Sequence, residues 1–437
     1  MADQTAAAPP RGAASVQLGP VARFLKATEI DTRMLGMVGA LAIIWIGFHV
    51  ASGGTFLTAR NLWNLSVQTS SIAVMSTGMV LIIVTRNIDL SVGSMLGFIG
   101  MMMGVMQADW LPSIWGYDHP LTWIVTLLFG AAVGVLIGGV HGYIIAYLGV
   151  PAFIVTLGGL LAWRGGAWWV TSGRTVAPMD GTFGLIGGGT EGAIGATASW
   201  AIALVVCAAI VAGLVSGRAR RRRFNFPLRP LWAEGVLGSL GCGLTLAAVA
   251  VANSYPWPSR VAARYAEANN IPVPEGGLLI AHGLAIPVLV ALAVGLAMTF
   301  LTTRTRFGRY VFAIGGNPEA AELAGVDVRW VKMKIFMLMG ALVSIGAAIS
   351  TARLNAATNA QGTLDELYVI AAAVIGGTSL AGGAGTIYGA MLGALVMQSL
   401  QSGMVLMGLD TPLQNIVVGL VLVLAVWVDT MYRGKTL

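Results

Sequence analysis

The side chains that most often carry chemistry are few in this sequence, and they are scattered. The two cysteines, Cys207 and Cys242, both lie inside apolar segments, a placement that predicts neither a disulfide framework nor a thiolate metal site. The four histidines are spread along the chain with no pair at the spacing of metal ligands. This pattern favours packing or interfacial histidines, and it predicts no bound metal and no cofactor.

Nucleotide and nucleophile motifs are equally sparse. The Gly-Lys-Thr at residues 434–436 has Asp429 where the first glycine of a phosphate-binding loop should stand. The sequence contains neither an H-E-x-x-H zinc motif nor a G-x-S-x-G nucleophile turn. We therefore predict no catalytic residues and no enzyme activity in this chain.

One polar stretch, residues 313–334, does have the pattern of a defined structural element between two long apolar segments. Asn317 is a favourable N-cap, and Pro318 follows at the first helical position. Glu319 and Glu322 place negative charge near the start of the same helix, where the helix dipole favours it. The pattern therefore predicts that a helix begins at Pro318.

The predicted helix is short, about two turns over residues 318–324. Ala320 and Ala321 are strong helix formers, and Gly325 stands where a left-handed residue ends a helix. A helix of this length is marginal in water on its own. Two alternatives stay open: it docks into a partner protein on the inner face and acts as a lever, or it lies on the inner leaflet.

The elements that position these residues are predicted to be membrane-spanning helices. Of the 437 residues, 57% are hydrophobic and only 10% are charged, far fewer charges than a soluble domain carries. The composition predicts an all-α polytopic membrane protein with about 10–12 transmembrane helices. The apolar segments lie near 34–51, 63–85, 92–107, 122–148, 152–171, 198–216, 232–254, 281–303, 333–352, 366–380, 387–406 and 413–431.

The charge distribution predicts the orientation of the chain. The net charge is +7, and most of the 25 Lys and Arg residues fall in segments placed inside when both termini are cytoplasmic. The basic run at residues 218–223 is most simply an inner-face stop signal, with a lipid-headgroup role as the second choice. Residues 1–33 are expected to be a mostly disordered cytoplasmic tail, followed by a transmembrane domain at 34–437.

Two apolar pairs are interrupted by polar, glycine-containing stretches. These breaks lie near residues 86–91 and 376–385, and both pairs have the same predicted orientation. Paired broken helices point to a transport path, because irregular backbone at membrane depth must line a cavity or be buried in protein. The alternative is two ordinary tight turns at the inner surface.

Several motifs, in order, resemble a known family. Glu319, Ala320 and Ala321 with the following Gly325 are similar to the cytoplasmic "EAA" loop of ABC importer permeases. The chain most resembles the ribose/xylose-type sugar permeases, and within these the xylose type. The further likenesses are NIDLSVGSM (87–95), GVPAFIVTLGGLLAWRGGAWWVTSGRTV (149–176) and VIAAAVIGGTSLAGGAGTIYGAMLGAL (369–395). One departure is Met337-Leu338, where the general importer motif has Leu-Pro.

The resemblance implies a set of partners and a function. The chain would be the permease subunit of an importer for a monosaccharide, a pentose such as xylose, in the cell inner membrane. It would work with a cytoplasmic ATP-binding subunit, a periplasmic sugar-binding protein and a second permease subunit as a homodimer, within the lipid bilayer and without nucleic acid. The ATP-binding subunit would act through residues 317–325. A secondary transporter or facilitator for a small polar solute remains the alternative function.

The resemblance also suggests which residues contact the sugar. At the breaks, hydroxyl and carboxylate groups could bond sugar hydroxyls, or Asp89 could instead cap the next helix. The aromatic and guanidinium groups near residue 164 could stack on and bond a sugar, although interfacial tryptophans are routine. The predicted path residues are Asn87, Asp89, Ser91, Thr378, Ser379, Trp163 and Arg164. Residues 217–280 are expected to be an insertion that adds one span and a periplasmic loop.

Overall fold

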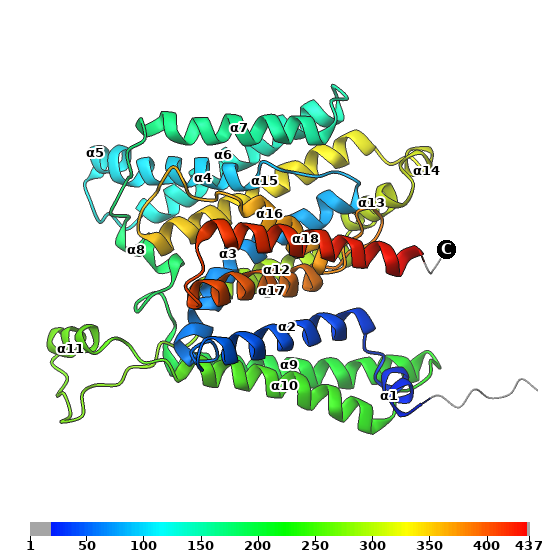
Figure 1. The fold of residues 1–437 in the computed structure, drawn as a ribbon, viewed down its shortest axis with the longest axis horizontal. Helices are drawn as coiled ribbons and strands as arrows, with labels where there is room; N and C mark the ends of the chain where they lie inside the picture. Colours follow the sequence, from blue (N-terminus) through cyan, green and yellow to red (C-terminus); the bar gives the residue numbers. More distant parts are fainter. Residues whose placement is uncertain (1–18, 435–437) are drawn as a thin grey trace, which may run out of the picture.

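The computed structural model describes residues 19–434, in which helices are joined by loops (Figure 1). This described part holds four isolated β-bridges but no strand, which confirms the predicted all-α fold. The helices of its first half are α1 (Pro20–Thr28), α2 (Thr32–Ala51), α3 (Ala59–Val84), α4 (Val92–Val105), the π-turn η1 (Met106–Trp110), α5 (Leu111–Trp115), α6 (Thr122–Ala146), α7 (Ala152–Thr171), α8 (Gly181–Gly184) and the 3-10 turn η2 (Leu185–Gly187).

The second half contains the remaining helices and the predicted polar helix. They are α9 (Gly195–Arg223), α10 (Leu231–Asn253), α11 (Ser259–Ala268), α12 (Ile286–Arg304), α13 (Arg306–Gly316), α14 (Pro318–Leu323), α15 (Val328–Leu354), α16 (Asp365–Ile375), α17 (Ile387–Leu406) and α18 (Thr411–Gly434). Within residues 19–434, eight helices are long and apolar enough to cross a membrane: α2, α3, α6, α9, α10, α12, α15 and α17. The other four apolar segments of the sequence coincide with α4, α7, α16 and α18.

Both predicted helix breaks are present. Residues 85–91 separate α3 from α4, and residues 376–386 separate α16 from α17 without helical structure. Each break carries a residue with positive φ, Arg86 at +62° and Gly377 at +87°. The polar, glycine-containing stretches therefore interrupt the helices as the sequence predicts.

Small residues bring the central helices into backbone contact. A methyl group at Gly134 of α6 would overlap the carbonyl of Gly340 on α15, and one at Gly340 would overlap the carbonyl of Gly134. The Ser344 hydroxyl donates a hydrogen bond to the Gly130 carbonyl at 2.8 Å. Gly130 and Gly134 on α6 thus serve close helix packing inside the chain, as is typical of membrane helices.

The helix ends sort onto two opposite sides of the bundle. Figure 1 shows α1, α13 and α14 at one end, and α5, α8 and α11 at the other. The side with α14 carries the basic run at the end of α9, so it is the inner side by the charge rule. Of the predicted N-terminal tail, residues 1–18 lie outside the described residues, and Pro20–Thr28 form α1.

Helices α9 and α10 form a hairpin at the edge of the bundle (Figure 1). The loop after α10 contains the short helix α11, and it reaches away from the other helices. The segment 217–280, expected to be an insertion, thus comprises the end of α9, all of α10 and this loop.

Candidate functional site: inner helix, helix breaks and outer cavity

The polar stretch at the inner side forms the predicted helix, α14. The Asn317 side-chain oxygen accepts a hydrogen bond from the Ala320 amide at 3.1 Å, and Pro318 is the first helical residue. Gly325 has φ +82°, a conformation that favours glycine and stops the helix. The sequence therefore determines both ends of α14 locally.

α14 exposes most of its surface. Ala321 is buried at 5%, whereas Glu319 and Glu322 are exposed. Leu323, the last residue of the helix, is 91% exposed. Single exposed apolar side chains are common on protein surfaces, so Leu323 leaves both predicted positions of this helix open: docked on a partner protein or lying on the inner leaflet. The sequence analysis does not single out Leu323, because a leucine at this position is also an ordinary helix-forming residue.

The first break holds the predicted residues Asn87, Asp89 and Ser91 in local contacts. Asp89 is 1% exposed, and its carboxylate accepts hydrogen bonds from the Ser91 amide at 2.9 Å and the Ser91 hydroxyl at 2.6 Å. The Asn87 amide donates to the Thr85 carbonyl at 3.0 Å. Asp89 thus stabilises the turn that begins α4, which is the geometry of the capping alternative.

Trp163 joins this break through a buried histidine. The Trp163 indole N–H donates to His141 Nε2 at 3.1 Å, and His141 Nδ1 lies 3.5 Å from the Ser91 hydroxyl. Because the indole can only donate, Nε2 of His141 carries no proton. The group fixes α7 against α4 and α6, and Phe98 packs on the Trp163 ring at 5.2 Å between centroids.

Arg164 supports the loop that precedes α16. Its guanidinium donates to the carbonyls of Asn359 at 3.1 Å and Gln361 at 2.8 Å. That loop lies directly over α4, where a methyl group at Gly97 would meet the Gln361 carbonyl at 2.6 Å. The bonds of Arg164 therefore hold an outer loop in place over the bundle.

The second break is a tight, buried turn. The Ser379 amide donates to the Ala384 carbonyl at 2.8 Å, and both Thr378 and Ser379 are 0% exposed. Within the described residues the Thr378 hydroxyl has no hydrogen-bond partner. The two breaks also meet each other, because the Gly383 amide donates to the Val84 carbonyl at 2.9 Å.

A polar cavity opens at the opposite end of the same helices. Its volume is about 400 Å3. It lies near the start of α3 and the ends of α15 and α17, away from α14. Its lining residues are Asn61, Asn64, Val67, Gln68, Ser71, Ile72, Ile349, Ser350, Arg353, Asp365, Gln398, Gln401, Ser402, Val405 and Leu406. None of the path residues predicted from the sequence is among them.

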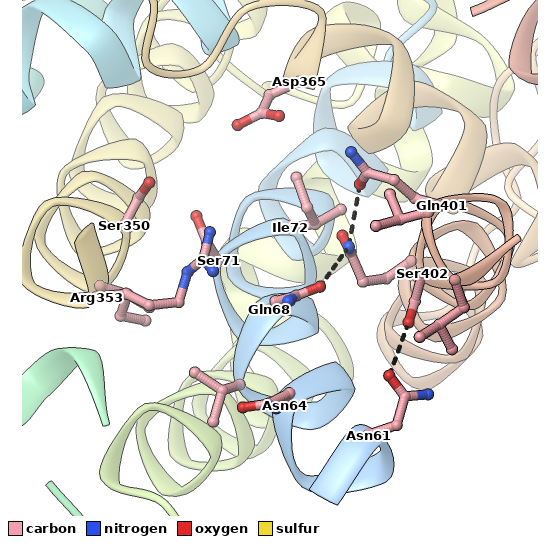
Figure 2. Close-up of a pocket in the computed structure, with 15 residues that line it drawn as sticks. Asn61, Asn64, Gln68, Ser71, Ile72, Ser350, Arg353, Asp365, Gln401 and Ser402 are labelled. Atoms are coloured by element: carbon pink, nitrogen blue, oxygen red, sulfur yellow. Dashed lines mark hydrogen bonds between the residues drawn. The ribbon is translucent and has the colours of Figure 1, made fainter. Parts of the chain in front are cut away.

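The cavity wall combines amides and hydroxyls with one basic and one acidic side chain (Figure 2). The Gln398 amide donates to Gln68 at 3.2 Å and to Gln401 at 3.0 Å. Among the described side chains, Arg353 and Asp365 have no hydrogen-bond or ion-pair partner. Figure 2 shows them on different walls of the cavity. Such a mixed donor and acceptor set suits a ligand rich in hydroxyl groups.

The sequence did carry a signal for this cavity. Asn61, Asn64, Gln68 and Ser71 recur at three- and four-residue spacing, which places them on one face of α3. Polar residues inside an otherwise apolar span are costly and mark functional sites. The stripe was visible, but its partners on α17 lie too far along the chain for the sequence to pair them.

At the inner surface, α1 is held by charge pairs. The Glu29 carboxylate contacts Arg221 at 2.6 Å and Arg229 at 2.7 Å. Hydrogen bonds from these two guanidinium groups lower the pKa of Glu29 from 4.5 to about 2. These contacts connect α1 to the α9–α10 hairpin.

A bundle of apolar helices with a polar cavity at one end fits a membrane transport protein. Its sequence matches, over residues 61–426, the family described as "Branched-chain amino acid transport system / permease component". The chain belongs to this family of transport permeases. No solved structure matches this chain.

Its relatives include sugar permeases. The chain is 36% identical over 412 residues to the xylose transport system permease protein XylH of Haemophilus influenzae, covering 94% of this chain and 100% of that one. It is 37% identical to XylH of Escherichia coli K12, covering 93% and 94%. The ribose import permease protein RbsC of the same strain is 32% identical over 86% of this chain and 87% of its own. These likenesses confirm the predicted resemblance to ribose/xylose-type permeases.

Proposed function

We propose that the chain is the permease subunit of an ABC importer for a pentose such as xylose, located in the cell inner membrane. The relatives named for xylose transport match it over nearly the full length of both chains. The observation that carries the mechanism is α14, a capped helix that exposes Leu323 between α13 and α15. A permease of this class works with an ATP-binding subunit and a substrate-binding protein.

The ATP-binding subunit is proposed to bind α14. Residues Asn317 to Glu322 and Gly325 give the helix defined ends, and Leu323 supplies an apolar anchor for a pocket on the partner. α15 begins shortly after α14, with the Asp327 side chain accepting a hydrogen bond from the Trp330 amide at 2.9 Å. A push on α14 is therefore passed directly to α15, which also lines the outer cavity.

The sugar is proposed to enter through the outer cavity and to leave past the two helix breaks. Amide, hydroxyl, guanidinium and carboxylate groups line the entrance. The proposed inner part of this route runs along the two breaks, where Asn87, Asp89, Ser91, Thr378 and Ser379 lie. A second copy of the chain would complete the membrane complex as a homodimer.

The proposal is tested by reconstituting the chain in liposomes. The complete system contains the ATP-binding subunit, the sugar-binding protein and ATP, and labelled xylose uptake is measured with ribose and allose as competitors. We expect xylose accumulation only when all components and ATP are present. Accumulation by the chain alone, driven by an ion gradient, would instead identify a secondary transporter.

A further inference from the structure

Three segments that are distant in the sequence meet at the inner end of the bundle. They are the end of α3, the end of α13 and the break between α16 and α17. The Arg86 guanidinium donates to the carbonyls of Gly315 at 3.1 Å and Gly316 at 2.8 Å. The Gly383 amide donates to the Val84 carbonyl at 2.9 Å. We call this group the inner junction.

The inner junction has no spare room. A methyl group on Gly315 would overlap the Val84 carbonyl oxygen and would stand 2.7 Å from the Gly383 amide nitrogen. One on Gly382 would lie 2.6 Å from Cγ of Arg86 and 2.8 Å from the Gly315 carbonyl oxygen. Since backbone atoms cannot yield as flexible side chains do, the three segments must move together or separate completely.

Arg86 suits a role between these segments. Its φ of +62° is uncommon for a residue with a side chain, and such conformations persist where the surrounding structure enforces them. Its planar guanidinium offers several donors in a fixed fork, which can hold two adjacent carbonyls at once. A positive charge at the end of α13 is also favourable for the helix dipole.

The carbonyls that Arg86 holds come directly before α14. Gly316 is followed by Asn317, the N-cap of α14. We propose that Arg86 is the positioning residue that ties α14 to both helix breaks, so that one movement of α14 opens or closes both breaks together. This inference rests on the proposed function, because it needs a partner that moves α14.

The decisive variants are Arg86→Gln and Gly315→Ala, with Gly316→Ala as the matched control. A methyl group on Gly316 meets nothing within 4 Å, and it leaves the carbonyl that Arg86 binds. The readouts are ATP hydrolysis stimulated by the sugar-binding protein, and xylose molecules accumulated per ATP, in the complete liposome system. Arg86→Lys tests whether a positive charge alone, without the planar guanidinium that bonds two carbonyls, preserves xylose uptake per ATP.

We expect Arg86→Gln and Gly315→Ala to assemble with the ATP-binding subunit and to hydrolyse ATP, while uptake per ATP falls by about tenfold or more. Gly316→Ala should match the wild type, and Arg86→Lys should lie between. Unchanged uptake per ATP in both decisive variants overturns the inference. Loss of assembly in both also overturns it, since the junction then serves folding alone. If the wild type shows no ATP-dependent uptake, the proposed function itself fails.

Discussion

The two ends of the same central helices are built from different residues and behave differently. At the outer end, α3, α15 and α17 carry Asn, Gln, Ser and Arg side chains that keep the helices apart around a cavity of about 400 Å3. At the inner end, glycines let backbone meet backbone at the inner junction. The outer end thus encloses space between the helices, whereas the inner junction leaves no space for a methyl group at Gly315 or Gly382.

Under the proposed function, this difference would let the chain admit solute from one side at a time. Long polar side chains at the outer end bond across a gap, as Gln398 does to Gln68, and such bonds between membrane helices contribute only about 0.6 kcal/mol each. They can be exchanged for bonds to a ligand. The contacts of the inner junction involve backbone atoms, so a ligand cannot replace them one at a time.

The largest effect is expected from Gly382→Val, which disrupts the packing of the inner junction. Gly382 has φ +88°, and a side chain there would collide with Arg86 and Gly315. Backbone strain and overpacking together should lower the free energy of unfolding by about 3 kcal/mol. The control is Gly377→Val, where φ is +87° but a Cβ atom would meet no other residue within 4 Å beyond its chain neighbours. Thermal unfolding in detergent should show a clearly larger Tm decrease for Gly382→Val; equal decreases would contradict the packing argument.

A smaller effect is expected at the exposed helix of the inner side. Leu323→Asp removes an apolar anchor and should weaken binding of the ATP-binding subunit about 30-fold, or about 2 kcal/mol. Ala324→Asp adds the same charge one residue away, without removing an anchor, and should weaken binding less. Titration of the subunit onto the permease in nanodiscs measures both. Similar losses for both variants would mean that charge alone, and not Leu323, determines docking.

The outer cavity should respond more mildly, because each of its bonds is weak. Gln398→Ala removes the bonds to Gln68 and Gln401 and should raise the half-saturating xylose concentration about fivefold, or about 1 kcal/mol. Ser399→Ala is the control, because the Ser399 hydroxyl accepts from Trp45 at 2.9 Å and donates to the Leu395 carbonyl at 2.6 Å. The cavity is not the entrance if the two variants have the same concentration dependence.

The smallest effect is expected at Glu29, on the inner surface. Its pKa is about 2 in the folded chain against 4.5 otherwise, so its pairs with Arg221 and Arg229 stabilise the fold above pH 4.5. That stabilisation is lost as the pH falls toward 2. Glu29→Gln should therefore lower Tm slightly at pH 7, and the difference should vanish near pH 2 and shrink in high salt. A difference that grows on acidification would contradict the pairing.

Much of this arrangement could be predicted from the sequence, because it depends on local physics. The apolar segments, the ends of α14 at Asn317 and Gly325, and the two helix breaks all follow from residue type and spacing. Each of these features is determined within a few turns of helix.

What the sequence could not predict depends on which distant residues meet. Gln68 finds Gln398, and Arg86 finds Gly315, only after the bundle has formed. The sequence predicts sugar contact for Trp163 and Arg164 from their chemistry, whereas in this structure they bond to His141 and to an outer loop. Their predicted contact with substrate remains a prediction, whereas their contacts within the fold are now defined.

The burial of α3 has a consequence for how the chain is made. In its most apolar stretch, 94% of the residues are inside the protein, and the helices that cover it, α15 and α17, are synthesised much later. During translation the amide-bearing side chains of α3 therefore lie in the membrane before α15 and α17 have been synthesised. The ribosome has to finish most of the polypeptide before its early helices become stable, so a chain cut short before α17 should be a target for quality-control proteolysis.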